Sequence, residues 1–144
     1  MIFTKRPPKD FHANVEVVSC FCEYNGRILL LRRQSHKQYG NTWGPPAGKI
    51  NESESPTEAM VRELQEESGI TALENELKHS GKFLVRYPEY DFVFHIFHLP
   101  LKEIPEVKIK EEEHRAYQWF LPDEALKREL IRDEDEVIKR FFKI

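Results

Sequence analysis

Residues 48–70 read GKINESESPTEAMVRELQEESGI and contain one helix with the signals for both of its ends. Ser55 is a favourable N-cap residue, Pro56 suits the first helical position, and Glu58 completes a capping box with Ser55. Gly69 supplies the left-handed residue on which helices commonly end. The stretch therefore predicts a helix from about Pro56 to Ser68.

The predicted helix has an unusually acidic face. At about 100° per residue, the carboxylates of Glu63, Glu66 and Glu67 share one arc, and the apolar residues fall on another. Arg62 is the one cation between residues 55 and 69, so this crowding of like charge destabilises a bare helix. A solvated surface is the plain interpretation of two adjacent Glu residues. Three carboxylates on one face predict a site for a hard divalent cation, because Mg²⁺ takes oxygen ligands.

The same stretch follows a spaced signature, G-x5-E-x7-R-E-U-x-E-E-x-G-U, in which U is a bulky aliphatic residue. The matching positions are Gly48, Glu54, Arg62, Glu63, Leu64, Glu66, Glu67, Gly69 and Ile70. A random chain of this length would contain the pattern with a probability on the order of 10⁻⁷ or less. The pattern resembles that of the Nudix hydrolases. The resemblance implies an α/β fold class, with an α/β/α sandwich around a mixed β-sheet, and Mg²⁺ or Mn²⁺ as cofactor. It also implies hydrolysis of a phosphoanhydride in a nucleoside diphosphate linked to another moiety.

The resemblance also assigns roles to residues of the stretch. It implies that Glu63, Glu66 and Glu67 are metal ligands, together with the backbone carbonyl of Ala47. Arg62 would orient Glu63, and Glu54 would brace the preceding loop against the helix. Ala47 stands where Gly is commoner in the family, and Ala restricts the backbone to negative φ.

Water attack on a phosphoanhydride needs a general base. By resemblance this role falls either on Glu63 or on a Glu in a later loop, here within the run 111–113. Glu113 is the preferred candidate of that run because Glu113-His114 directly precedes the strand that contains Trp119. The alternative interpretation of the run is a solvated charged surface.

Residues outside the signature bear on the substrate. Arg33 matches a phosphate-contacting arginine of MutT-type members, although an exposed arginine at a strand end is the plainer interpretation. Trp43, Tyr87 and the segment 113–119 resemble the diadenosine polyphosphate hydrolases, in which the tyrosine stacks on adenine. We therefore expect dinucleoside polyphosphates such as Ap4A. A MutT-like (d)NTP pyrophosphohydrolase is the alternative, and a non-catalytic nucleotide-binding module is a remote one.

The rest of the chain predicts a mixed sheet. Residues 14–24 and 27–33 read as a hairpin across Asn25-Gly26, and residues 34–49 as an irregular connection rich in Gly and Pro. Further strands are expected at about 78–87, 91–99 and 116–121, followed by one or two helices within 123–142.

Length and composition narrow the class of protein. The 144 residues suggest one domain over 1–144, and no apolar run approaches the roughly 20 residues of a membrane span. The net charge of −3 gives no whole-chain attraction to nucleic acid or membrane. Cys20 and Cys22 read as two free, buried thiols. We expect a cytoplasmic monomer or homodimer whose partner is a small-molecule nucleotide.

Overall fold

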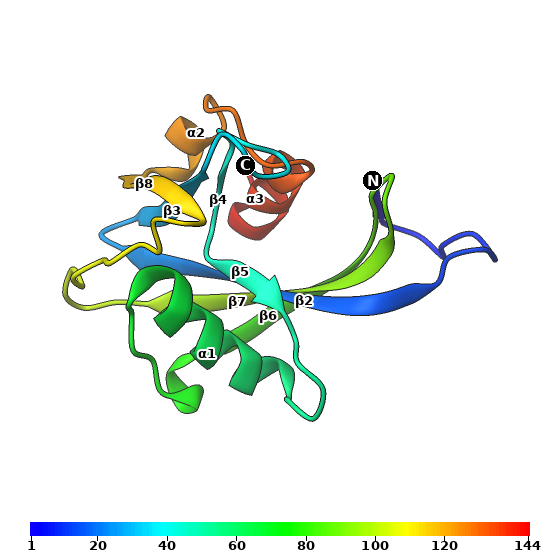
Figure 1. The fold of residues 1–144 in the computed structure, drawn as a ribbon, viewed down its shortest axis with the longest axis horizontal. Coiled ribbons are helices and arrows are strands. Elements are labelled where there is room, and N and C mark those ends of the chain that lie inside the picture. Colours follow the sequence, from blue (N-terminus) through cyan, green and yellow to red (C-terminus); the bar gives the residue numbers. More distant parts are fainter.

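A computed structural model describes residues 1–144 and shows a curled mixed β-sheet with helices on both of its faces (Figure 1). The strands are β1 (Ile2–Phe3), β2 (Ala13–Tyr24), β3 (Arg27–Arg33), β4 (Trp43–Gly44), β5 (Ala47–Lys49), β6 (Lys78–Arg86), β7 (Asp91–Pro100) and β8 (His114–Phe120). The helices are α1 (Pro56–Ser68), α2 (Pro122–Ala125) and α3 (Glu134–Phe142), with one 3₁₀ turn at Glu74–Glu76. None of these helices is both long enough and apolar enough to span a membrane.

The long strand β2 organises the sheet. It pairs in parallel with β7 along one edge, and the main path of the sheet runs β1-β6-β7-β2-β3-β4. On its other edge, β2 pairs with β3 only next to the hairpin turn, where Asn25 and Gly26 have φ values of 53° and 76°. Further along that edge β5 takes over, with Ser19 opposite Ala47. The edge of β2 is therefore shared between β3 and β5, and β5 also contacts α1.

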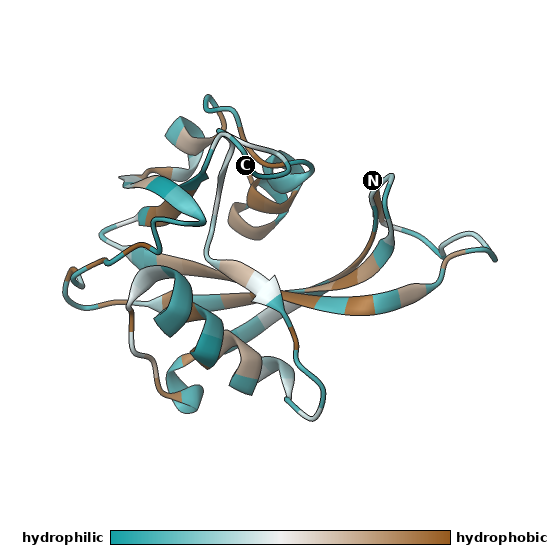
Figure 2. Cartoon of the chain, viewed as in Figure 1, coloured by the Kyte–Doolittle hydropathy of each residue, from teal (hydrophilic) through white to brown (hydrophobic).

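Apolar side chains form one core layer on each face of the sheet. Alternation along β2 sends Cys20 and Cys22 toward the α1 side, where they pack with Met60 and Leu64. Phe21 points the other way, into the layer covered by α3. Figure 2 shows apolar colour along the middle of the sheet strands and polar colour over much of α1. Both cysteines are buried and free, and their Sγ atoms lie 3.9 Å apart.

Helix α1 has the bounds that its end signals predict. The Ser55 hydroxyl accepts a hydrogen bond from the Glu58 amide at 3.1 Å, and the Glu58 carboxylate accepts one from the Ser55 amide at 3.0 Å. Gly69 ends the helix with a φ of 72°. The predicted capping box and glycine stop are confirmed.

Three details differ from the sequence prediction. Residues 34–49 are not irregular throughout, because β4 and β5 lie within them. β1 has no counterpart in the predicted elements, and β8 begins at His114 rather than at 116. The short strands β1, β4 and β5 form by pairing with β6, β3 and β2. Each has only two or three residues, which is too few to show the alternation of polar and apolar residues by which a strand is predicted.

Candidate active site

Glu63 lies directly over the backbone of Gly48. A Cβ atom placed on Gly48 would be 2.1 Å from the Glu63 carboxyl carbon, so only glycine leaves room for this carboxylate. Glu63 is 7% exposed, and its burial raises the pKa of its carboxyl, against the opposing effect of Arg62. The strand β5 and the helix α1 thus hold one acidic group in a fixed place beside Ala47.

Arg62 connects the helix to the loop before it. Its guanidinium donates two hydrogen bonds to Glu54, both at 2.8 Å, and one to Glu63 at 2.8 Å. It also donates to the Lys49 carbonyl at 3.0 Å and to Glu66 at 3.3 Å. Hydrogen bonds to Glu54 and Glu63 raise the pKa of Arg62 further above its usual range. These contacts are those expected of a residue that orients Glu63 and ties the loop to α1.

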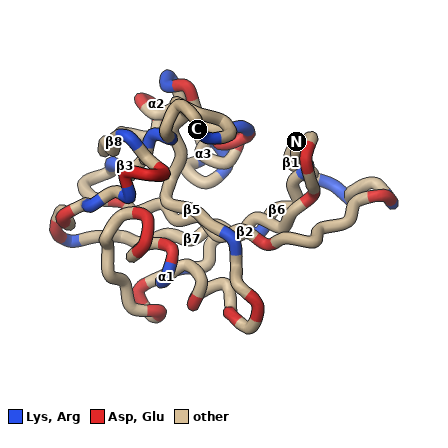
Figure 3. The backbone as a smooth tube through the Cα atoms, in the orientation of Figure 1, with Lys and Arg blue, Asp and Glu red and all other residues tan.

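Glu67 points to a different neighbour, His114 at the start of β8. The carboxylate Oε2 and the ring Nδ1 are 3.2 Å apart but are not aligned as a hydrogen bond, so both are buried polar atoms without a partner. Acidic positions follow α1 in Figure 3. Nevertheless, no three His, Cys, Asp or Glu side chains are close enough together to form a ready metal cluster. Arg62 bonds to both Glu63 and Glu66, whereas Glu67 faces His114, and the joint role of the three glutamates as metal ligands stays a prediction.

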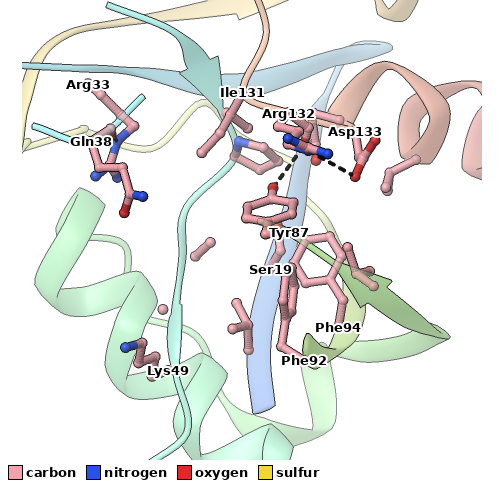
Figure 4. A pocket seen from close by; sticks show the side chains of 18 of the residues that line it. Ser19, Arg33, Gln38, Lys49, Tyr87, Phe92, Phe94, Ile131, Arg132 and Asp133 are labelled. Carbon is pink, nitrogen blue, oxygen red and sulfur yellow. Dashed lines mark hydrogen bonds and ion pairs between the residues drawn. The ribbon is translucent and has the colours of Figure 1, made fainter. Parts of the chain in front are cut away.

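Glu113 does not line the cavity that lies beside α1 (Figure 4). Its carboxylate lies 3.6 Å from Nζ of Lys37, and its carbonyl accepts a hydrogen bond from the Gln34 amide. The next residue, His114, does line this cavity. Sequence position alone could not distinguish the two, because the turn at residues 111–113 ends at Glu113 and β8 begins at His114, and this boundary decides which way each side chain faces.

A cavity of about 360 Å³ begins beside α1 and runs toward α3. Its wall near α1 is formed by Gly48, Glu67 and His114, with Arg33 close by, since Arg33 pairs with His114 across β3 and β8. The Arg33 side chain donates to the Gln38 carbonyl at 2.8 Å through Nε. This end of the cavity therefore combines the carboxylate of Glu67 with the cation of Arg33.

The other end of the cavity is aromatic. Figure 4 shows Tyr87, Phe92 and Phe94 on one side, with Arg132 and Asp133 above them, and Arg33 and Gln38 across the cavity. The Tyr87 hydroxyl donates to the Arg132 carbonyl at 2.8 Å, and its ring meets Phe92 edge to face, with the centroids 5.0 Å apart. Burial raises the pKa of Tyr87, with Asp133 and Glu134 adding to the effect.

Trp43 is placed differently from Tyr87. Its ring packs edge to face on Phe120 at 5.2 Å, its backbone bonds to residues 129 and 131, and it is not part of the cavity wall.

The cavity wall includes Glu134, a residue that the sequence did not single out. Glu134 is 3% exposed, and its Oε1 has no hydrogen-bond partner. Glu134 lies in the acidic run 133–136, and nothing in that run indicates a buried residue until the position of α3 is known.

A model of the NUDIX domain family matches residues 12–141. The chain belongs to the Nudix family. It is 30% identical to the CTP pyrophosphohydrolase of Escherichia coli (strain K12) over 129 residues, which cover 88% of this chain and 90% of that protein.

Solved structures give the same fold. A MutT protein from Methanosarcina mazei Go1 has a TM-score of 0.79 at 26% identity, with 90% of this Nudix chain and 93% of that chain covered. A C. elegans Ap4A hydrolase has a TM-score of 0.67 at 19% identity, covering 90% and 96%, and shows likeness of fold alone. The predicted Nudix membership and mixed-sheet α/β fold are confirmed, and the protein is a Nudix pyrophosphohydrolase.

The residues of this Nudix chain fit the divalent metal ions that the family generally uses. The buried Oε2 of Glu67 is without a partner at the cavity wall. The neighbouring acidic groups Glu63 and Glu66 offer only carboxylate oxygens, which are the donors that Mg²⁺ and Mn²⁺ prefer. The donor set thus suits a hard cation and not a soft one.

Proposed function

We propose that this Nudix enzyme hydrolyses nucleoside triphosphates to a monophosphate and pyrophosphate, with Mg²⁺ as cofactor and Mn²⁺ as a substitute. The observation that carries the proposal is the two-ended cavity, in which Glu67 and Arg33 lie at one end and aromatic rings at the other. Its volume of about 360 Å³ is near the lower end of the usual range for small-molecule sites. Room for one nucleoside favours a mononucleotide over a dinucleotide.

The proposed roles follow from placement. Glu63, Glu66 and Glu67 would hold the metal ion together with the Ala47 carbonyl, and the ion would neutralise charge on the phosphate oxygens. Arg33 has its terminal guanidinium nitrogens free of protein hydrogen bonds and would bind phosphate. When a water oxygen bonds to phosphorus and pyrophosphate leaves, the water's proton needs an acceptor. We assign that acceptor to Glu63, whose carboxylate lies against Gly48 of the cavity wall, with Glu113 as the alternative.

Dinucleoside polyphosphates such as Ap4A are the second candidate substrate. Tyr87 favours them, because it lies in the cavity wall where a stacked base would be bound. The two candidates differ in their products. A triphosphatase of the proposed kind releases pyrophosphate and a monophosphate, whereas asymmetric cleavage of Ap4A leaves ATP and AMP.

Purified protein should therefore be assayed with Mg²⁺ against the ribo- and deoxynucleoside triphosphates and against Ap4A, with products identified by ion-exchange chromatography. We expect the highest kcat/KM with a triphosphate and stoichiometric pyrophosphate. A preference for Ap4A with ATP and AMP as products would replace the proposal with the second candidate.

Removal of the Tyr87 ring tests whether this residue stacks on the base. Stacking on an aromatic ring contributes about 1–3 kcal/mol, so Tyr87→Ala should raise KM roughly 5- to 150-fold with kcat little changed. Tyr87→Phe keeps the ring and loses only the hydrogen bond to the Arg132 carbonyl, and it should keep most of the affinity. If Tyr87→Ala lowers the melting temperature but leaves KM unchanged, Tyr87 is a core residue only.

Glu67→Gln tests the metal assignment. The substitution keeps the side-chain volume but removes a charged ligand, so activity at limiting Mg²⁺ should fall at least tenfold and recover in part at high Mg²⁺. Magnesium titration of the initial rate measures this. Glu76→Gln, at an exposed 3₁₀ turn that does not line the cavity, is a matched control. An unchanged magnesium dependence of Glu67→Gln would remove Glu67 from the ligand set.

A further inference from the structure

Three ionisable side chains form a row across the face of the sheet that α1 covers. Glu16 lies on β2, His95 on β7 and His79 on β6, and these three strands are neighbours in the sheet. Nε2 of His95 lies 2.8 Å from Oε1 of Glu16, and Nδ1 of His95 lies 3.1 Å from Nε2 of His79. The His95 ring thus has a polar neighbour at each of its nitrogens.

This row is separate from the cavity. Along β7, Phe94 lines the cavity, and His95, the next residue, points to the opposite face of the sheet. Along β2, Val17 lines the cavity and Glu16 points away from it. None of the three side chains of the row belongs to the cavity wall, so the proposed hydrolysis gives them no role.

Hydrogen-bonding rules fix where the hydrogens of the row lie. An ionised carboxylate only accepts hydrogen bonds, so Nε2 of His95, which faces Glu16, carries a hydrogen. In a neutral ring the other nitrogen, Nδ1, then has a lone pair, and this lone pair is directed at Nε2 of His79. Two ring nitrogens therefore face each other across 3.1 Å, where either a proton or a metal ion can join them.

We propose that Nε2 of His79 and Nδ1 of His95 chelate a divalent transition-metal ion of the Zn²⁺ class. No group of three His, Cys, Asp or Glu side chains is arranged to hold a metal ion, so water completes the coordination. Neutral imidazole suits Zn²⁺ and Cu²⁺, whereas Mg²⁺ and Mn²⁺ suit oxygen donors. The site therefore takes a different class of ion from the one proposed at Glu67, and it does not depend on the proposed function.

The spacing of the two nitrogens suits a single ion. Zinc–nitrogen bonds are about 2.0–2.1 Å long, so an ion bound to both nitrogens would subtend an angle of roughly 100° between them. This angle lies between the about 90° of square-planar coordination and the about 109° of tetrahedral coordination, which Cu²⁺ and Zn²⁺ adopt. His79 is exposed, so its ring can turn toward the ion.

Neighbouring groups hold both rings in place. His95 is 4% exposed, and Glu16 supplies the carboxylate that a metal-bound histidine commonly has at its second nitrogen, where it fixes the tautomer. The His79 ring stacks on Phe97, with the centroids 4.8 Å apart and 17° between the planes. Burial lowers the pKa of His79, with His95 and Lys82 adding to the effect, and this favours the neutral ring that a metal ion needs.

Calorimetric titration of Zn²⁺ into the protein tests the site, in a buffer with saturating Mg²⁺ that occupies the carboxylates of the active site. We expect the unmodified protein to bind one Zn²⁺ per chain. His79→Gln removes one ligand from an exposed position and should weaken binding at least about tenfold. Glu16→Gln keeps both ligands but removes the carboxylate behind His95, and it should weaken binding about 10- to 100-fold. His36→Gln, also exposed, is the matched control and should bind Zn²⁺ like the unmodified protein.

Two further measurements locate the ion without using activity. Proton–nitrogen correlation spectra of the imidazole rings should show Zn²⁺ on Nε2 of His79 and on Nδ1 of His95. Zn²⁺ at about 100 times its dissociation constant should raise the Tm of the unmodified protein by several degrees, because it binds the folded state, and should leave the Tm of His79→Gln nearly unchanged. Absence of Zn²⁺ binding, or equal binding by the unmodified protein and His79→Gln, overturns the proposal.

Discussion

Glu63→Gln is expected to lower kcat by roughly 10²- to 10⁴-fold while the variant remains folded. The carboxylate of Glu63 is held over Gly48 by Arg62, beside the carbonyl that is proposed as a metal ligand. Gln keeps the shape and one hydrogen-bond acceptor but can neither take up a proton nor carry the charge that a cation needs. Initial rates with the preferred triphosphate at saturating Mg²⁺ measure the effect, and circular dichroism checks the fold.

Glu113→Gln is the matched control for this prediction. From the sequence, Glu113 was preferred as the general base because it directly precedes β8. In the structure its carboxylate pairs with Lys37 and does not line the cavity. We expect its kcat to stay within a few-fold of the unmodified enzyme, and assays in EDTA give the floor against which both variants are judged. A large loss in Glu113→Gln with little change in Glu63→Gln would return the role of base to Glu113.

Features set by neighbours in sequence could be predicted. The capping box at Ser55, the stop at Gly69 and the hairpin turn at Asn25-Gly26 each depend on residues within one or two turns of chain. The contacts among Arg62, Glu54 and Glu63 lie within ten residues of one another, on one helix and the loop before it. Local patterns therefore place this half of the candidate site.

The other half depends on pairing between distant segments. His114 reaches Glu67 only because β8 pairs with β3, and β5 lies under α1 only because it continues the edge of β2. Glu134 is buried because α3 covers the sheet from the side opposite to α1. No spacing in a single sequence encodes these approaches, so Glu113 was preferred over His114 and Glu134 was missed. Trp43 and Tyr87 show the same limit. Both were predicted to bind substrate, but Tyr87 lines the cavity and Trp43 packs on Phe120 outside it.

Gly48→Ala tests the placement of Glu63 without touching its chemistry. The added Cβ would lie 2.1 Å from the Glu63 carboxyl carbon and 2.3 Å from each of its oxygens, so the carboxylate or the strand must move. β5 is held by its pairing with β2, and the carboxylate is held by Arg62 at 2.8 Å. The φ of Gly48 is not in the left-handed region, so the backbone itself tolerates alanine. Displacement of a reacting group by about 1 Å can cost roughly 10²-fold in rate, and we expect a fall in kcat of that size.

The double variant Gly48→Ala/Glu63→Gln decides how the loss arises. If alanine acts by moving the Glu63 carboxylate, the double variant should be no slower than Glu63→Gln alone, because residues that act as one unit are strongly non-additive. Gly81→Ala is the matched control, since its Cβ would find its nearest neighbour at 3.7 Å, an ordinary contact. Full activity of Gly48→Ala, or losses that multiply in the double variant, would show that the approach of Glu63 to β5 is not what sets the rate.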